Sequence, residues 1–220
     1  DSWVIKAVQQ VAEINEKAGE LVIHGVNLSL GSNFDPESYG CGFTPLCNEL
    51  RRLWRQGVVV VVAAGNEGLA YLVQGDGEAY PTNMDLSIGD PANLEDAIAV
   101  GSVHKSSPHN YGVSYFSSRG PTADGRQKPD VVAPGEKIVS AHHGFRLAKP
   151  GTWMVEMSGT SMAAPHVSGV VASFLSARRE FIGFPDRVKR SVLDNCTALE
   201  RAGYVQGKGL PNLMRMLGST

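Results

Sequence analysis

Residues 57–68 read GVVVVVAAGNEG, with five consecutive valines at Val58–Val62. When helices cover both faces of a parallel sheet, neither face of its strands contacts water. The sequences of such strands are therefore continuous apolar runs. Gly57, just before the run, suits the left-handed conformation in which many helices end. The stretch therefore predicts a helix end followed by a central strand of a parallel sheet.

The segments on either side of this strand alternate between helical and extended patterns. Apolar residues recur at helical spacing from Ser2 to Lys17, LVIHGVNLSL at 21–30 reads as a buried strand, and a second helical pattern covers Pro45–Gln56. Helices and strands in alternation predict parallel strand pairing. We expect an α/β fold of three layers, with helices on both faces of a mainly parallel sheet.

The remainder of the chain adds further strands and helices. Extended patterns are expected at Ala97–Val103 and at Val131–Ala141, the second interrupted at Pro134-Gly135. A buried helix is expected from Thr160 toward Arg178, and two short helices within Pro185–Leu217, separated by an exposed loop at 203–209.

Length and composition fit one globular domain or a large part of one. The chain has 220 residues, of which 42% are hydrophobic and 19% charged, with a net charge of −2. This charge gives no general attraction to nucleic acid. The longest apolar run, Val58–Ala64, is far below the roughly 18 residues that span a bilayer. We therefore expect neither a nucleic-acid nor a membrane partner.

The segment GTSMAAPH, residues 159–166, contains the strongest candidate for chemistry. Ser161 follows a glycine at the start of the predicted helix, where its hydroxyl would lie beside unpaired backbone N–H groups. Acyl transfer needs such donors, because negative charge develops on the carbonyl oxygen under attack. We place Pro165 in the first helical turn. Taken alone, a serine in this setting is far more often a helix cap than a nucleophile.

The eleven residues GTSMAAPHVSG, 159–169, resemble the signature around the nucleophile of subtilisin-like serine peptidases. The resemblance continues in the family's order over nearly the whole chain, through VNLSLGS at 26–32, VVVVVAAGNEG at 58–68, PANLEDAIAVGSV at 91–103, FSSRGP at 116–121, KPDVVAPGEKIVSA at 128–141 and GKGLPN at 207–212. It implies a subtilisin-like fold and a serine endopeptidase that works through an acyl-enzyme intermediate with a Ser-His-Asp triad.

The resemblance assigns roles to residues that match the family's motifs. It makes Ser161 the nucleophile, and it makes Asn66 a side-chain donor that joins the Ser161 N–H in the oxyanion hole. The substrate would lie as an added strand along Ser29, Leu30 and Gly31, with Ala64 and Gly65 as the opposite wall of the main pocket. Gly89 would form the floor of this pocket and leave room for a large apolar group, although Asp90 stands beside it.

Two family motifs are absent from these 220 residues. Neither the Asp-Thr/Ser-Gly turn nor the His-Gly-Thr-His helix start, which supply the carboxylate and the base, occurs here. His24 and His166 offer no substitute, and His142-His143 read as a loop or strand edge. We expect residues 1–220 to be a partial catalytic domain, nearly inactive alone. The 21–30 strand would then offer an open edge to the missing amino-terminal part or to another copy of the chain.

Cofactors and cysteines carry weaker expectations. The resemblance requires no cofactor and allows calcium as a structural ion, but the acidic residues between 76 and 96 are scattered and predict no metal site. Cys41 and Cys47 could form a bridge, although a third cysteine, Cys196, makes the count odd. Secretion is suggested by family habit alone.

Two other classes of function stay open. A pseudopeptidase would keep the groove for peptide binding without cleavage, but an intact Ser161 and Asn66 argue against it. A nucleotide-binding α/β domain would use AAGNEG as a phosphate turn, yet the G-x-G-x-x-G spacing and the Walker lysine are missing. The S-x-x-K match at Ser102–Lys105 has no accompanying motif.

Overall fold

The computed structural model describes residues 2–32, 41–73, 75, 77–144 and 153–219. Its central feature is a parallel sheet in the order β1-β2-β5-β6, formed by Gly25–Leu28, Val59–Ala63, Ile98–His104 and Val131–Glu136. The valine run is its second strand and is buried along its whole length. The prediction of a parallel α/β sheet is therefore confirmed.

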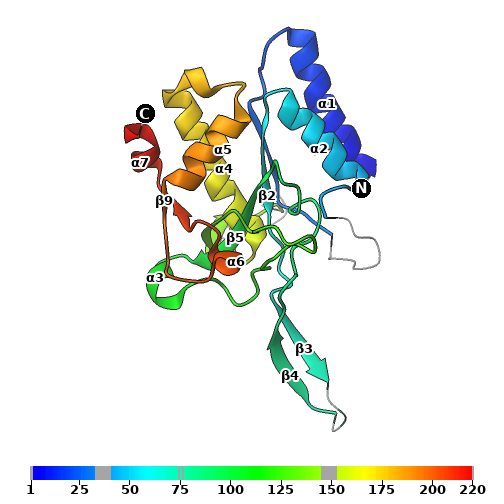
Figure 1. Ribbon diagram of the computed structural model, residues 1–220, viewed down its shortest axis with the longest axis vertical. Helices are drawn as coiled ribbons and strands as arrows, with labels where there is room; N and C mark the ends of the chain where they lie inside the picture. Colours follow the sequence, from blue (N-terminus) through cyan, green and yellow to red (C-terminus); the bar gives the residue numbers. More distant parts are fainter. Residues whose placement is uncertain (1, 33–40, 74, 76, 145–152, 220) are drawn as a thin grey trace.

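Helices cover both faces of this sheet, which makes three layers. Helix α4 (Thr160–Ala177) packs across all four strands, while α2 (Pro45–Arg55) packs on β2 and against α1 (Ser2–Ala18). Figure 1 shows α1 and α2 side by side, with α4, α5 and α7 grouped elsewhere around the sheet. The Thr44 side chain caps α2, and Gly57 follows the helix with a φ of 99°.

The first strand is shorter than the predicted 21–30. The Asn15 side chain in α1 accepts hydrogen bonds from the N–H groups of Val22 and Ile23 at 3.0 and 2.9 Å. These backbone groups are thus bound to the helix, and strand pairing begins only at Gly25. The apolar run did not reveal this cap, because an asparagine inside a helix pattern gives no sign of its partner.

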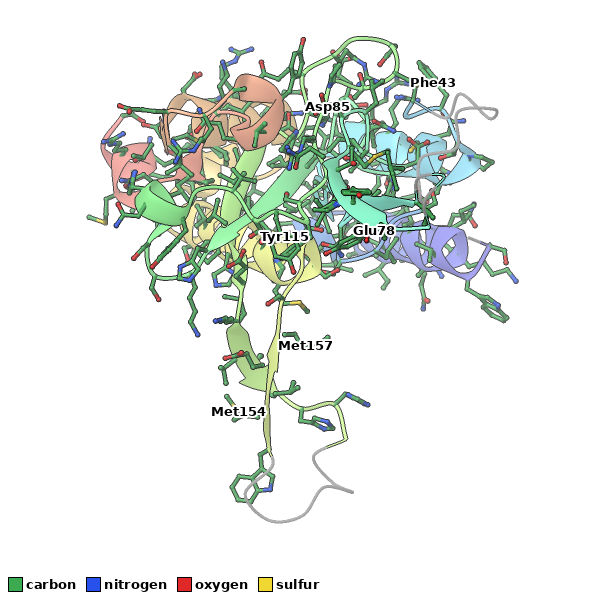
Figure 2. The ribbon with its side chains drawn as sticks, turned by 90° about the horizontal axis from the view of Figure 1, so that it is seen from below. Phe43, Glu78, Asp85, Tyr115, Met154 and Met157 are labelled. Carbon is green, nitrogen blue, oxygen red and sulfur yellow. The ribbon has the colours of Figure 1, made fainter. Side chains whose placement is uncertain are left out.

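The predicted strand 131–141 is two strands. The break falls at Lys137, which has a φ of 52°, and Pro134-Gly135 lie inside β6. Strand β7 (Ile138–Ala141) leaves the sheet and pairs antiparallel with β8 (Met154–Met157). Figure 2 shows this hairpin projecting from the body, with Met154 and Met157 on it.

A second hairpin, β3 (Leu69–Val73) with β4 (Ala79–Asn83), was not predicted and projects as an arm (Figure 1). The last third contains the two predicted helices, but Gly203–Gln206 in the expected exposed loop is helical and the Gln206 side chain is buried. The remaining elements are α3 (Pro108–Tyr111), η1 (Arg179–Phe181), α5 (Pro185–Asp194), β9 (Cys196–Thr197), α6 (Gly203–Gln206), β10 (Leu210–Pro211) and α7 (Leu213–Gly218).

A buried ionic cluster joins β6 to its neighbours. Asp130 accepts from Lys128 Nζ at 2.6 Å and lies 3.2 Å from Lys189 Nζ on α5. Burial opposes the charge on Asp130, but the two ammonium groups hold its pKa below the ordinary value. Burial lowers the pKa of Lys128 to about 8. Lys128 and Lys189 also both donate to Ala97 O, which ties the cluster to the start of β5.

Candidate active site

Ser161 lies in the first turn of α4 and is joined to the segment after β1. Its Oγ donates to Ser29 O at 3.2 Å, and Ser29 Oγ donates in return to Ser161 O at 2.9 Å. Pro165 lies beyond the first turn of α4, so the prediction that it stands in that turn was wrong. Because proline has no N–H, Ser161 O lacks its usual helical donor four residues on, and Ser29 supplies one instead.

Asn66 lies at the carboxyl end of β2, beyond Gly65, which has a φ of 111°. Its Oδ1 accepts from the Thr160 N–H at 2.9 Å. A backbone N–H can only donate, so the carbonyl side of the amide must face Thr160. The Nδ2 group has no partner among the described residues and is left to donate to whatever enters the cavity that Asn66 lines.

Thr160 was not among the predicted site residues, although it stands inside the GTS motif. Its Oγ1 lies 3.1 Å from Asn66 Oδ1 and 3.2 Å from both the N and the O of Gly65. This side chain is fully buried. It therefore fastens the loop after β2 to the amino terminus of α4 and orients the amide of Asn66.

Asn66 and Ser161 line one cavity of about 230 Å³. Five of the six residues expected to bind substrate also line it, and the sixth, Ser29, contacts Ser161 from outside the lining. The lining residues are Leu30, Gly31, Ser32, Ala63, Ala64, Gly65, Asn66, Glu67, Gly89, Thr160 and Ser161. The sheet thus brings together loops that are far apart in sequence, at the carboxyl ends of β1 and β2.

The Asp90 side chain does not enter this cavity. Its carboxylate accepts from the Gly42 N–H at 2.9 Å and from Cys47 Sγ at 3.4 Å, on the side of the 41–47 loop. The space above Gly89 therefore stays open. Cys41 and Cys47 are free thiols in the structure, and burial raises the pKa of Cys47 to about 12.

Glu67 adds a negative charge to the cavity lining and was not assigned a role from the sequence. Its Oε2 accepts from Ser118 Oγ at 2.9 Å, and the Glu67 N–H donates to the same hydroxyl at 3.1 Å. Glu67 is visible in the AAGNEG motif, but the motif does not show whether its carboxylate points into the cavity at the end of β2 or away from it.

No histidine lines the cavity in the part of the chain that the structure describes. His166 is exposed, and its Nδ1 lies 2.9 Å from Met162 O within the same helix. His142 and His143 lie just after β7 with stacked rings, so the loop-or-edge interpretation is confirmed. Ser161 therefore has no histidine base beside it within the described residues.

A second, larger cavity of about 590 Å³ runs beside the free edge of β1. Most of its lining is apolar and comes from β1 and its approach, from β2 and from α4, including Val26, Val59 and Val171. His24 and Asn27 add polar groups. Within the described ranges, β1 pairs only with β2, so its other edge has no strand beside it.

The described residues contain neither a metal-binding cluster nor a membrane-spanning helix. No group of three or more His, Cys, Asp or Glu side chains is placed to hold an ion there. None of the helices described is long and apolar enough to cross a membrane.

A helix-covered parallel sheet that places a helix-terminal serine and a carboxamide in one cavity has the layout of serine-hydrolase chemistry. Comparison with known proteins gives the family. The model described as the subtilase family matches residues 1–210, and the chain belongs to this family of serine proteases.

Individual relatives match most of this chain but only part of their own length. Pyrolysin of Pyrococcus furiosus is 35% identical over 217 residues, which cover 86% of this chain and 14% of pyrolysin. The serine protease AprX of Bacillus subtilis is 32% identical, over 84% of this chain and 40% of its own length. Among solved structures, the patellamide maturation protease PatA is 27% identical with a TM-score of 0.67, over 98% of this chain and 68% of that one. The chain thus spans less than half of these two curated relatives.

Proposed function

We propose that this chain carries the nucleophile and the oxyanion hole of a serine endopeptidase. Asn66 and Ser161 lie in one cavity, and Thr160 occupies Asn66 Oδ1 so that Nδ2 can donate. The observation that carries the proposal is this shared cavity. Negative charge on a carbonyl oxygen there would meet the Asn66 amide and the Ser161 N–H, both held in place before the reaction.

In the proposed reaction, Ser161 Oγ bonds to the substrate carbonyl carbon while a base takes its proton. The C–N bond then breaks, and the base returns the proton to the departing amine. Water attacks the remaining acyl-serine ester and releases the second product. In the structure, the Ser161 hydroxyl donates to Ser29 O. The base must therefore replace Ser29 O as the acceptor of this hydrogen bond before Ser161 attacks the substrate.

We infer that the base and its carboxylate come from a segment outside these 220 residues. The free edge of β1 and the adjoining 590 Å³ cavity would receive that segment as a further strand with its side chains against α4. A second copy of this chain at the same edge would bring no such motif, so it would complete the sheet without activating Ser161. Alone, the chain would be nearly inactive.

The substrate would lie along Ser29, Leu30 and Gly31, with one side chain in the cavity. The walls at Ala64 and Gly65 and the open floor at Gly89 suit a large side chain. Recognition by main-chain pairing and one dominant pocket reads sequence loosely, which is the behaviour of a broad endopeptidase. The substrates are then proteins or peptides. Calcium as a structural ion and secretion of the protein both stay predictions. Secretion is not general among the relatives, since one of them is the major intracellular serine protease of Bacillus subtilis.

A fluorophosphonate probe tests this proposal, because it labels only an activated serine. The chain would be treated with the probe alone and together with the polypeptide encoded upstream of it. Mass spectrometry would then locate the labelled residue. We expect labelling at Ser161 only in the reconstituted sample, and none in Ser161→Ala. Equal labelling of the isolated chain would place a base within it, and no labelling together with retained peptide binding would favour the pseudopeptidase.

A further inference from the structure

The hairpin of β3 and β4 exposes apolar side chains on both of its faces. Tyr71 is 67% and Val73 70% exposed on one face, and Leu72 is 51% exposed on the other. Figure 1 shows the hairpin projecting beyond the carboxyl end of β2, away from the body of the molecule. A two-stranded hairpin without further support is only marginally stable in water. Its surface is therefore suited to being covered by a partner.

The two outer edges of this hairpin differ. Pro81 on β4 stands opposite Tyr71 and has no N–H, and a proline at a sheet edge blocks pairing with another strand. Strand β3 has no proline, and among the described residues it pairs only with β4. Its outer edge offers five residues, or roughly 17 Å, to an extended chain.

The hairpin is anchored beside the candidate active site. Glu67 lines the cavity, and the Gly68 N–H that follows donates to Phe116 O at 2.9 Å. A Cβ at Gly68 would fall 2.1 Å from Ser117 O, so this backbone is pressed against the 116–117 segment. Met84 N–H donates to Gly68 O and closes the base of the hairpin. A chain that leaves the cavity past Glu67 therefore meets a hairpin whose first and last residues are held against the body of the molecule.

The charge along this arm has one sign. Residues 67–85, which include the hairpin and its two ends, contain four Asp or Glu and no Lys or Arg. Glu67, Glu78 and Asp85 are exposed at the cavity, near the turn and after β4; Figure 2 labels the last two. The cationic residue Arg119 is tied by its backbone to Ser87, near the end of the hairpin where β4 returns to the body. Its side chain is only partly exposed.

We propose that the β3–β4 hairpin is a binding arm for a positively charged, extended segment of the polypeptide substrate, which adds as a strand to the outer edge of β3. Alternate apolar side chains of that segment pack on Tyr71 and Val73, while its Lys and Arg side chains reach the carboxylates. This rests on the proposed function, since the cavity must hold the neighbouring part of the same substrate.

Peptide binding to the whole chain with Ser161→Ala tests the arm without requiring catalysis. The probe is a fluorescein-labelled peptide of alternating Val and Lys, compared with the matching Val and Glu peptide by fluorescence anisotropy at low salt. Val73→Lys is the test variant and Tyr71→Lys a second one on the same face. Val139→Lys, on the exposed β7–β8 hairpin, is the matched control.

We expect the Lys peptide to bind at least tenfold more tightly than the Glu peptide, with a tenfold loss in Val73→Lys and Tyr71→Lys and less than twofold in Val139→Lys. Equal losses in all three variants, or none, would overturn the inference. So would light scattering that showed a dimer dissolved by Val73→Lys, because the arm would then bind a second copy. Fluorophosphonate labelling of Ser161 reports on the proposed function separately, so either idea can fail alone.

Discussion

At the scale of single residues, Thr160 sets the geometry of the candidate site. It joins the amino terminus of α4 to the loop after β2 and fixes which way the Asn66 amide turns. The carboxamide is therefore held ready by contacts that need no substrate. Preorganised donors of this kind cost no rearrangement during the reaction, which is why they lower its barrier.

Asn66→Asp removes the proposed donor while keeping the shape of the side chain. The aspartate keeps an oxygen for the Thr160 N–H, but it replaces the Nδ2 donor with a second carboxylate oxygen and so adds a negative charge beside the oxyanion. We expect kcat of the reconstituted enzyme to fall by at least the roughly 10²–10³ that loss of one such donor costs in subtilisin, with little change in KM. Steady-state peptide hydrolysis checks this. An unchanged kcat would remove Asn66 from the oxyanion hole.

Ser29 and Pro165 form a testable pair. Ser29 Oγ supplies the hydrogen bond that Pro165 denies to Ser161 O. Ser29→Ala should lower the free energy of unfolding by about 1 kcal/mol, and by less in a Pro165→Ala background, where the helix regains its own donor. Urea unfolding of the four proteins measures the coupling. Strict additivity would mean that the two residues do not share this carbonyl.

At the scale of elements, the buried cluster on β6 links strands to α5. Asp130→Asn leaves the buried Lys128 and the partly buried Lys189 facing a neutral amide, and we expect a loss of about 3–5 kcal/mol. Glu13→Gln in the exposed Lys17 pair is the control, with a loss below about 0.5 kcal/mol. Similar losses in both variants, measured by urea unfolding, would contradict this role.

The cluster around Asp130 should make the free energy of unfolding depend on pH. The pKa of Asp130 is lower in the folded chain than in the unfolded one, so the unfolded chain binds its proton first as pH falls. The stabilisation is therefore complete above about pH 4–5 and is lost as the pH falls toward the folded pKa. The difference in unfolding free energy between the wild type and Asp130→Asn should shrink in acid, and a constant difference would refute the assignment.

The sequence predicted the continuous elements well and the hairpins poorly. The valine run and the helix patterns carry their own signal, since burial on both faces or on one stripe dictates residue type. β3 and β7 carry no such alternation, because most of their side chains are exposed and no buried face dictates residue type. The cavity residues were predicted through the resemblance, but Thr160 and Glu67 were not, since their roles depend on contacts across the sheet.

At the scale of the whole molecule, β1 is an edge strand of the sheet, with no strand on its outer side in the part of the chain that the structure describes. Alternate amides of Gly25–Leu28 that do not donate to β2 should exchange rapidly with deuterium in the isolated chain, and become protected when the upstream segment is added. Amides of β2 should stay protected in both samples. Equal protection of β1 with and without that segment would show that the edge is already covered.

The central claim is that Ser161 and Asn66 act on one carbonyl group, and a structure of a peptide-aldehyde adduct of the reconstituted enzyme tests it most directly. The aldehyde carbon should be bonded to Ser161 Oγ, with its oxygen about 2.7–3.1 Å from Asn66 Nδ2. An adduct on Ser161 whose oxygen points away from Asn66, or a bond to another residue, would contradict the account.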